Sequence, residues 1–124
     1  MNTIKRLPDG ELAVMQAVWD FDRPVGRAEL ETALADSHPM AATTLLTLLS
    51  RLEDKGFLAR EKAGRGGLWA PLVSREDYLA AQGSRFYHKL CGGDLSRFAS
   101  ALCHSGLTQE ELAQLRRLLE EVEQ

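Results

Sequence analysis

The sequence predicts a mainly α-helical fold with a small β-hairpin, arranged as residues 1–73 followed by a C-terminal helical arm, residues 74–124. Two observations predict it. Apolar residues recur at the spacing of amphipathic helices along most of the chain, and two short extended runs in its middle flank a glycine-rich loop. With 44% hydrophobic and 27% charged residues among 124, the chain has the composition of a protein with a packed core.

Two helices are expected before the middle of the chain. The first begins at Asp9, which we expect to cap it, and ends before the breaker Asp22-Arg23-Pro24. The second covers about residues 27–35, and the Ser-His-Pro signal at 37–39 predicts the turn that follows it.

The segment 41–55 has the clearest helical pattern of the chain. Four of its leucines fall at i, i+3, i+4 and i+7 and predict one buried face, and Gly56 is expected to end the helix. The opposite face carries short polar side chains and one arginine. The leucines of the buried face are Leu45, Leu48, Leu49 and Leu52, and the outward residues are Thr43, Thr44, Leu46, Thr47, Ser50 and Arg51.

A β-hairpin is predicted after this helix. Residues 57–62 and 68–72 form its strands around a loop at 63–67, and Pro71 is compatible only with a strand end or an edge. Three basic side chains belong to this hairpin, namely Arg60, Lys62 and Arg65.

The arm is expected to hold about three helices. Ser74 resembles a helix cap, Gly92-Gly93 interrupts the first long helix, and Thr108 with Glu111 forms a capping box before the last one. The arm's apolar stripes have little else to pack against, so we expect a second copy of the chain to cover them in a homodimer. The expected interface residues are Tyr78, Leu79, Phe86, Leu90, Leu95, Phe98, Leu102, Leu112, Leu115 and Leu119.

Three helices followed directly by a hairpin make a winged helix-turn-helix, whose third helix can enter a DNA major groove. The net charge of −3 does not by itself favour nucleic acid, but the charge is segregated: residues 51–65 carry +2 and residues 110–124 carry −3. Hydroxyl groups suit base edges, whereas Arg51 suits a phosphate. The sequence therefore predicts contact with double-stranded DNA through Thr43, Thr44, Leu46, Thr47, Ser50, Arg51, Arg60, Lys62 and Arg65.

Two other functions stay open at this point. A winged helix can serve as a protein-interaction module that never touches DNA. Alternatively, the chain is a metal- or thiol-responsive regulator that uses Cys91 and Cys103, with His88 one helical turn from Cys91, although a buried, reduced cysteine is commoner.

The sequence contains no enzyme signature such as G-x-S-x-G, H-E-x-x-H or a Walker loop, and no metal or cofactor is expected. The N-terminal residues hold no apolar run typical of a signal peptide, and no stretch is long enough to span a bilayer. A cytoplasmic location without membrane insertion is therefore expected.

Several segments resemble one known family. Residues 43–58 are similar to the recognition helix and first wing strand of the penicillinase-repressor family (BlaI/MecI/CopY), and residues 12–19 are similar to its first helix. Residues 69–78 resemble the second wing strand and the start of the dimerisation arm, and residues 107–119 resemble its last helix. The resemblance covers nearly the whole chain.

The resemblance implies a homodimeric bacterial repressor that binds a palindromic operator and controls antibiotic-resistance or stress genes. In part of the family a membrane-bound sensor peptidase induces cleavage of the arm. The better-known resistance repressors are cut at an Asn-Phe bond, where this chain has Ala101-Leu102, and the copper-responsive members carry paired Cys-x-Cys motifs that this chain lacks.

Overall fold

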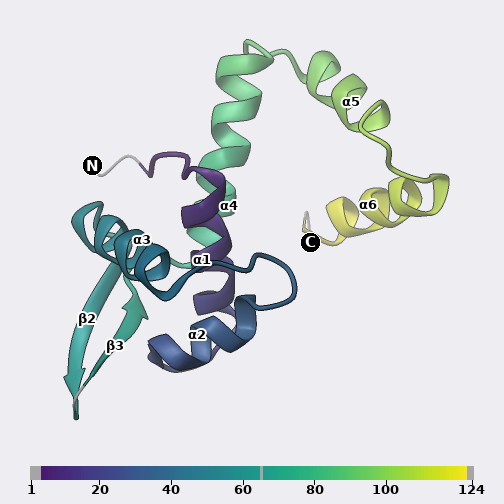
Figure 1. Ribbon diagram of the computed structural model, residues 1–124. Helices are drawn as coiled ribbons and strands as arrows, with labels where there is room; N and C mark the ends of the chain where they lie inside the picture. The colour runs from purple at the N-terminus through teal and green to yellow at the C-terminus, as the bar shows by residue number, and fades with distance from the viewer. Residues whose placement is uncertain (1–3, 65, 123–124) are drawn as a thin grey trace. The chain divides into compact units, whose positions relative to one another are not determined.

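The computed structural model describes residues 4–64 and 66–122, and the chain divides into two compact units, Met1–Gln82 and Gly83–Gln124. The first unit contains three helices, a small sheet and most of a fourth helix (Figure 1). Its elements in chain order are α1 (Asp9–Trp19), β1 (Val25–Gly26), α2 (Arg27–Leu34), α3 (Ala42–Asp54), β2 (Leu58–Ala63), β3 (Gly66–Pro71) and α4 (Arg75–Arg85). The predicted winged helix-turn-helix is therefore confirmed.

The start of α1 differs from the prediction. Asp9 is the first residue of the helix and not its cap, because Pro8 occupies the N-cap position and no side chain caps the helix there. A proline suits a position at the helix start because its fixed φ and missing N–H cost little there. Asp9 and Glu11 instead place negative charge in the first turn, where the helix dipole favours it.

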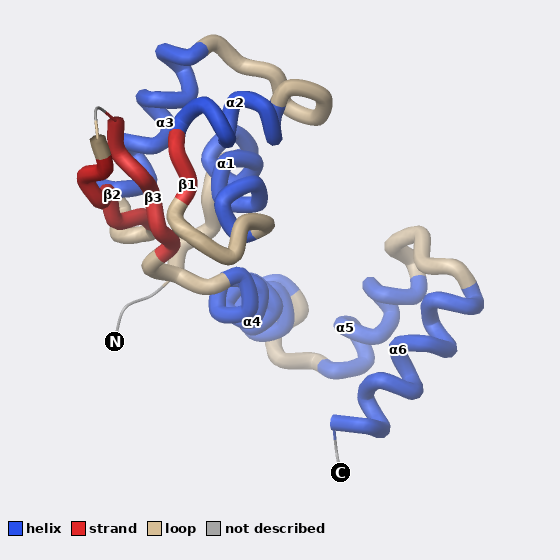
Figure 2. Tube along the Cα trace, turned by 90° about the horizontal axis from the view of Figure 1, so that it is seen from below, coloured by secondary structure: helices blue, strands red, loops and turns tan. Residues whose placement is uncertain are grey.

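The sheet has three strands, in the order β1-β3-β2, where the sequence predicted a two-stranded hairpin. The additional strand β1 contributes only two residues, Val25 opposite Trp69 and Gly26 opposite Leu68 (Figure 2). The hairpin is also longer than predicted. Strand β2 runs to Ala63 and β3 begins at Gly66, so the expected five-residue loop at 63–67 is a tighter turn in which Gly64 has a φ of 61°.

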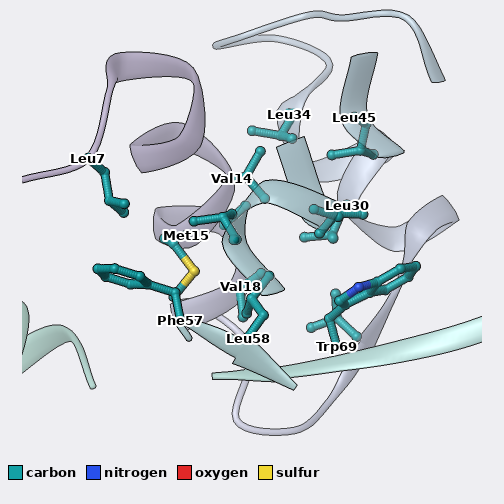
Figure 3. Packing of buried hydrophobic residues seen from close by; sticks show 14 of the residues in the cluster. Leu7, Val14, Met15, Val18, Leu30, Leu34, Leu45, Phe57, Leu58 and Trp69 are labelled. Carbon is teal, nitrogen blue, oxygen red and sulfur yellow. The ribbon is translucent and has the colours of Figure 1, made fainter. Parts of the chain in front are cut away.

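One hydrophobic core joins α1, α2, α3 and the sheet. It includes Met15 and Val18 from α1, Leu30 from α2 and Trp69 from β3 (Figure 3). Helix α3 contributes Leu45, Leu49 and Leu52, all at most 1% exposed. Leu48, predicted on the same buried face, is only half-buried at the margin of the core, because four leucines span a wider arc of the helix than the core covers.

Helix α4 begins as part of the first unit. Tyr78 is 4% exposed and its hydroxyl accepts a hydrogen bond of 2.9 Å from the backbone N–H of Leu7. The indole of Trp19 donates to the carbonyl of Val73 at 2.9 Å, and Arg75 pairs with Asp20 at 2.7 Å. Tyr78, which we expected at a dimer interface, therefore packs within its own protomer, and the division between the units falls at 82–83.

The second unit is built of short helical segments. The end of α4 passes into a π-helical turn, Phe86–Leu90, and is followed by α5 (Leu95–Cys103) and α6 (Gln109–Val122). Asp94 caps α5 by accepting from the N–H of Arg97. The predicted capping box of α6 is confirmed, with reciprocal bonds of 2.8 Å and 3.0 Å between Thr108 and Glu111.

An ion pair fixes the start of α2. The carboxylate of Glu29 bonds to the guanidinium of Arg23 and accepts the backbone N–H of Gly26, the residue that caps the helix. The hydrogen bond from Arg23, followed by the one from Gly26, lowers the pKa of Glu29 from 4.5 to about 2. A carboxyl with a lowered pKa stabilises the folded state when it is ionised.

We expect Glu29→Gln to lower the stability of the protein near neutral pH. The stability that Glu29 contributes is fully present above its ordinary pKa of 4.5 and is lost as the pH falls through about 2. Urea unfolding of both proteins at pH 7, at pH 4.5 and at pH 3 measures their free energies of unfolding. The difference between the two free energies should narrow as the pH falls below 4.5.

Glu31→Gln is the matched control, because the ion pair of Glu31 with Arg27 is longer, at 3.4 Å between exposed side chains. The free energies of unfolding of Glu29→Gln and of the natural protein could instead differ by the same amount at every pH. That result would contradict the role assigned to the Arg23–Glu29 pair.

Candidate nucleic-acid interface

The polar face of α3 points away from the core. Thr43, Thr44, Thr47, Ser50 and Arg51 are exposed, and Leu46 among them is 40% exposed. We call these six residues the outward face of α3. Their orientation follows from the burial of Leu45, Leu49 and Leu52 on the opposite side, so the predicted two-faced helix is confirmed.

Two threonines of this face differ in what their hydroxyls do. The hydroxyl of Thr47 donates to the carbonyl of Thr43 at 3.0 Å, so within the helix its proton is already engaged. Its lone pairs and its methyl group stay available to a ligand. Thr44 makes no side-chain hydrogen bond within residues 4–64 and 66–122, so its hydroxyl can both donate and accept.

The wing, defined as β2, β3 and the turn between them, has two chemically different faces. Side chains alternate along a strand, so Arg60 and Lys62 lie on the same side as the buried Leu58, whereas Glu61 lies on the other. The acidic residue of the wing thus points away from the side that joins the core. Arg65, the third predicted wing contact, lies outside the described residues.

A groove runs between the wing and the helices. Its volume is about 450 Å³, and its lining includes Arg27 from α2, Leu46 from α3, and Arg60 and Trp69 from the wing. Trp69 is bonded to α3, because the indole N–H donates to the carboxylate of Glu53 at 2.8 Å. The guanidinium of Arg60 lies 5.4 Å from the centre of the indole ring.

Ion pairs occupy most basic side chains elsewhere on the first unit. Arg23 pairs with Glu29, Lys55 with Glu11, and Arg75 with Asp20. Among the described residues, no ion pair involves Arg51, Arg60 or Lys62. Of the five described lysines and arginines of the first unit without an ion pair, three therefore lie on α3 and the wing, although the chain as a whole is acidic. The other two, Lys5 and Arg6, precede α1.

The comparisons with known proteins agree with this geometry. Residues 7–121 match the penicillinase repressor family. The penicillinase repressor of Bacillus licheniformis is 30% identical over 122 residues, which cover 98% of this chain and 94% of that protein. This chain belongs to the penicillinase repressor family. The family consists of DNA-binding transcriptional repressors and not of enzymes.

Solved structures support the assignment of the first unit. The DNA-binding domain of the repressor BlaI is 31% identical, with a TM-score of 0.54 over 63% of this chain and 94% of that domain. The monomeric form of Bacillus licheniformis BlaI, solved in complex with the blaP half-operator, has a TM-score of 0.52 over the same shares. Escherichia coli MarR in its reduced form is 23% identical with a TM-score of 0.50 over 94% of this chain and 77% of that chain, and shares the fold.

In this repressor the predicted arm residues differ in exposure. Only Cys91 is buried among the described residues of the second unit. Phe98, Leu102, Leu112 and Leu115 are half-buried, whereas Leu79, Phe86, Leu90, Leu95 and Leu119 are exposed. Ala101 and Leu102 lie inside α5 and are half-buried, so the bond between them is held within helix.

The two cysteines have different surroundings. Cys91 is 6% exposed, and Cys103 is exposed on α5. Within the described part of the chain, no three His, Cys, Asp or Glu side chains gather at one place where they could hold a metal ion. No helix in this same part combines the length and apolar character that crossing a bilayer requires.

Sequence reasoning missed Glu53 and Trp69 as residues of this repressor's site. Glu53 lies near the end of α3 and reads as an ordinary surface acid, and Trp69 reads as a core residue of a strand. The signal that joins them is tertiary, because 16 residues separate the indole donor from its acceptor.

A buried carboxylate of α1 forms an ion pair at the C-terminal end of α3. Glu11 of α1 is 3% exposed, and its only ion pair among the described residues is with Lys55, at 2.5 Å, directly after the last turn of α3. Lys55→Met is expected to destabilise the repressor by about 2–3 kcal/mol, because it leaves a buried charge without a partner. Urea unfolding measures the loss.

Two controls accompany this variant. Lys62→Met removes the same charge from an exposed site and should change stability by less than about 0.5 kcal/mol. Adding Glu11→Gln to Lys55→Met should restore most of the loss, since no buried charge remains. If the double variant is less stable than Lys55→Met alone, the ion pair is not what Lys55 contributes.

Proposed function

We propose that this chain is a homodimeric, sequence-specific repressor that places α3 in the major groove of a palindromic operator. The observation that carries the proposal is the outward face of α3, where hydroxyl groups and Arg51 are exposed. Arg60 and Lys62 of the wing add two cations that form no ion pair among the described residues. The half-operator complex of the similar BlaI protein supports DNA as the partner. Family membership favours antibiotic-resistance or stress genes as targets and a sensor peptidase as the inducing partner.

The side chains of α3 divide into two kinds of contact. Five side chains are small enough to let the helix approach base edges, namely Thr43, Thr44, Leu46, Thr47 and Ser50. The methyl group of a threonine can also contact the methyl group of a thymine. Arg51 has a longer side chain and lies near the helix end, so it suits a phosphate. The wing adds contacts to the DNA phosphate backbone, which position the protein without reading the base sequence. We assign these contacts to Arg60, Lys62 and Arg65.

We expect Thr44→Ala and Thr47→Ala to change which operator the protein prefers, at about 1–3 kcal/mol for each lost base contact. Selection of duplexes from a random library, followed by fluorescence anisotropy on the selected sequence and its single-base variants, measures the change. Arg51→Ala should instead weaken binding to all sequences alike and lower the salt dependence.

Thr32→Ala is the matched control for Thr47→Ala. Thr32 is exposed on α2, and its hydroxyl donates to the carbonyl four residues earlier at 3.1 Å, as the hydroxyl of Thr47 does. Both substitutions remove the same bond within a helix, so only a DNA contact distinguishes them. If both threonine substitutions on α3 leave operator choice unchanged, the assigned reading face is wrong.

The second unit, considered alone, supports the homodimer. Its described helices bury no residue, and only Cys91, directly after the π-helical turn, is buried. The unit also holds an aromatic cluster in which the ring centre of Phe98 lies 5.7 Å from that of Phe86 and 5.6 Å from that of Tyr87. A unit of this size with so small a core is not stable without a partner. Exposed apolar side chains on it (Leu90, Leu95, Leu118, Leu119 and Val122) supply the surface for one.

We expect Leu119→Asp to convert the protein from dimer to monomer, because it places a charge in the apolar stripe of α6. Sedimentation velocity measures the change, and affinity for a full palindromic site should fall toward that for a half-site. Ala113→Asp, an exposed position on the face of the same helix opposite the apolar stripe, is the control and should leave the dimer intact. A natural protein that sediments as a monomer, or a Leu119→Asp variant that remains a dimer, argues against this interface.

A further inference from the structure

Trp69 is held in place by burial of its ring and by one hydrogen bond. The ring is 3% exposed in the core between the sheet and the helices, and its N–H is bonded to Glu53 near the end of α3. Because that acceptor belongs to α3 and not to the wing, the indole connects the orientation of the wing to the orientation of the helix.

Arg60 lies directly across the hairpin from Trp69. The two residues are partners in the register of β2 and β3, and the guanidinium stands 5.4 Å from the ring centre. An arginine over an indole face gains about 0.5–1 kcal/mol at an exposed site, enough to favour one conformation of a flexible side chain. The ring therefore directs the charge of Arg60 along the groove that Leu46 of α3 also lines.

Gly67 leaves the space that Arg60 occupies. A Cβ atom at this position would lie 2.4 Å from Nε and 3.0 Å from Cγ of Arg60, closer than non-bonded atoms approach. The backbone of Gly67 is not in the left-handed region, so conformation does not demand glycine there. A Cβ atom at the neighbouring Gly66 would have no other atom within 4 Å.

We propose that Trp69 is a positioning residue for DNA binding: held by Glu53, it keeps Arg60 in the groove between wing and α3 as a contact to the phosphate backbone, and Gly67 keeps that position open. The proposal rests on the proposed function, since it names how one contact of the DNA interface is held. Arg60 touches the DNA, whereas Trp69, Glu53 and Gly67 act through it.

The experiment measures the salt dependence of binding to a mixed-sequence duplex by fluorescence anisotropy. Arg60→Gln should lower the slope of log K against log salt concentration by about 0.9 for each wing that engages the duplex. Gly67→Ala should lower it by the same amount, although it removes no charge. The double variant should be no weaker than either single variant, because both remove one contact.

Gly66→Ala is the matched control and should keep the slope of the natural protein. A second readout needs no DNA: in the free protein the indole ring should shift the Nε–H resonance of Arg60, and Gly67→Ala should abolish that shift while Gly66→Ala keeps it. This readout also separates displacement of Arg60 from a general loss of fold, as does thermal unfolding of each variant.

Two results of the DNA-binding experiment overturn the proposal while the natural protein still binds DNA. One is a Gly67→Ala variant that is folded and keeps the natural slope, and the other is an Arg60→Gln variant that does so. An Arg60 resonance without a ring-current shift overturns it as well. Failure of the natural protein to bind any duplex would instead count against the proposed function.

Discussion

The burial of one face of α3 is the constraint on which the DNA-binding surface depends. Leu45, Leu49 and Leu52 are closed off from water by α1, α2 and the sheet, and each buried leucine contributes about 1.5–3 kcal/mol. Rotating the helix by one residue, about 100°, would expose these leucines and bury polar side chains in their place. The hydrophobic core therefore sets the direction of every hydroxyl on the outward face.

Polar contacts limit the sliding and tilting of α3, which the leucines alone do not prevent. A leucine face resists rotation of α3 about its axis but opposes sliding and tilting less, because apolar contacts are not directional. Bonds from the end of α3 have direction: Lys55 bonds to the buried Glu11 of α1, and Glu53 bonds to Trp69 of the wing. These two contacts hold one end of the helix to the scaffold on one side and to the wing on the other.

The sequence predicted those features that depend on local periodicity. The two faces of α3 and the capping box at Thr108 follow from the spacing of a few neighbouring residues, and both were predicted correctly. Strand β1 could not be predicted, because two residues are too few to show alternation and their pairing with β3 is tertiary. The burial of Tyr78 was missed for a similar reason: its partner Leu7 lies 71 residues away.

The distribution of charge explains how an acidic chain can carry a surface suited to DNA. Four acids of the first unit, Glu11, Asp20, Glu29 and Glu31, form ion pairs, so their negative charge is partly compensated. Glu53, the acid of α3 closest to the wing, is turned toward an indole N–H, and Glu61 faces away from the groove. Arg51, Arg60 and Lys62 have no such partners in the described residues. Net charge is thus a poor guide to this surface, because what a phosphate meets is the local set of charges on α3 and the wing and not the sum over the chain.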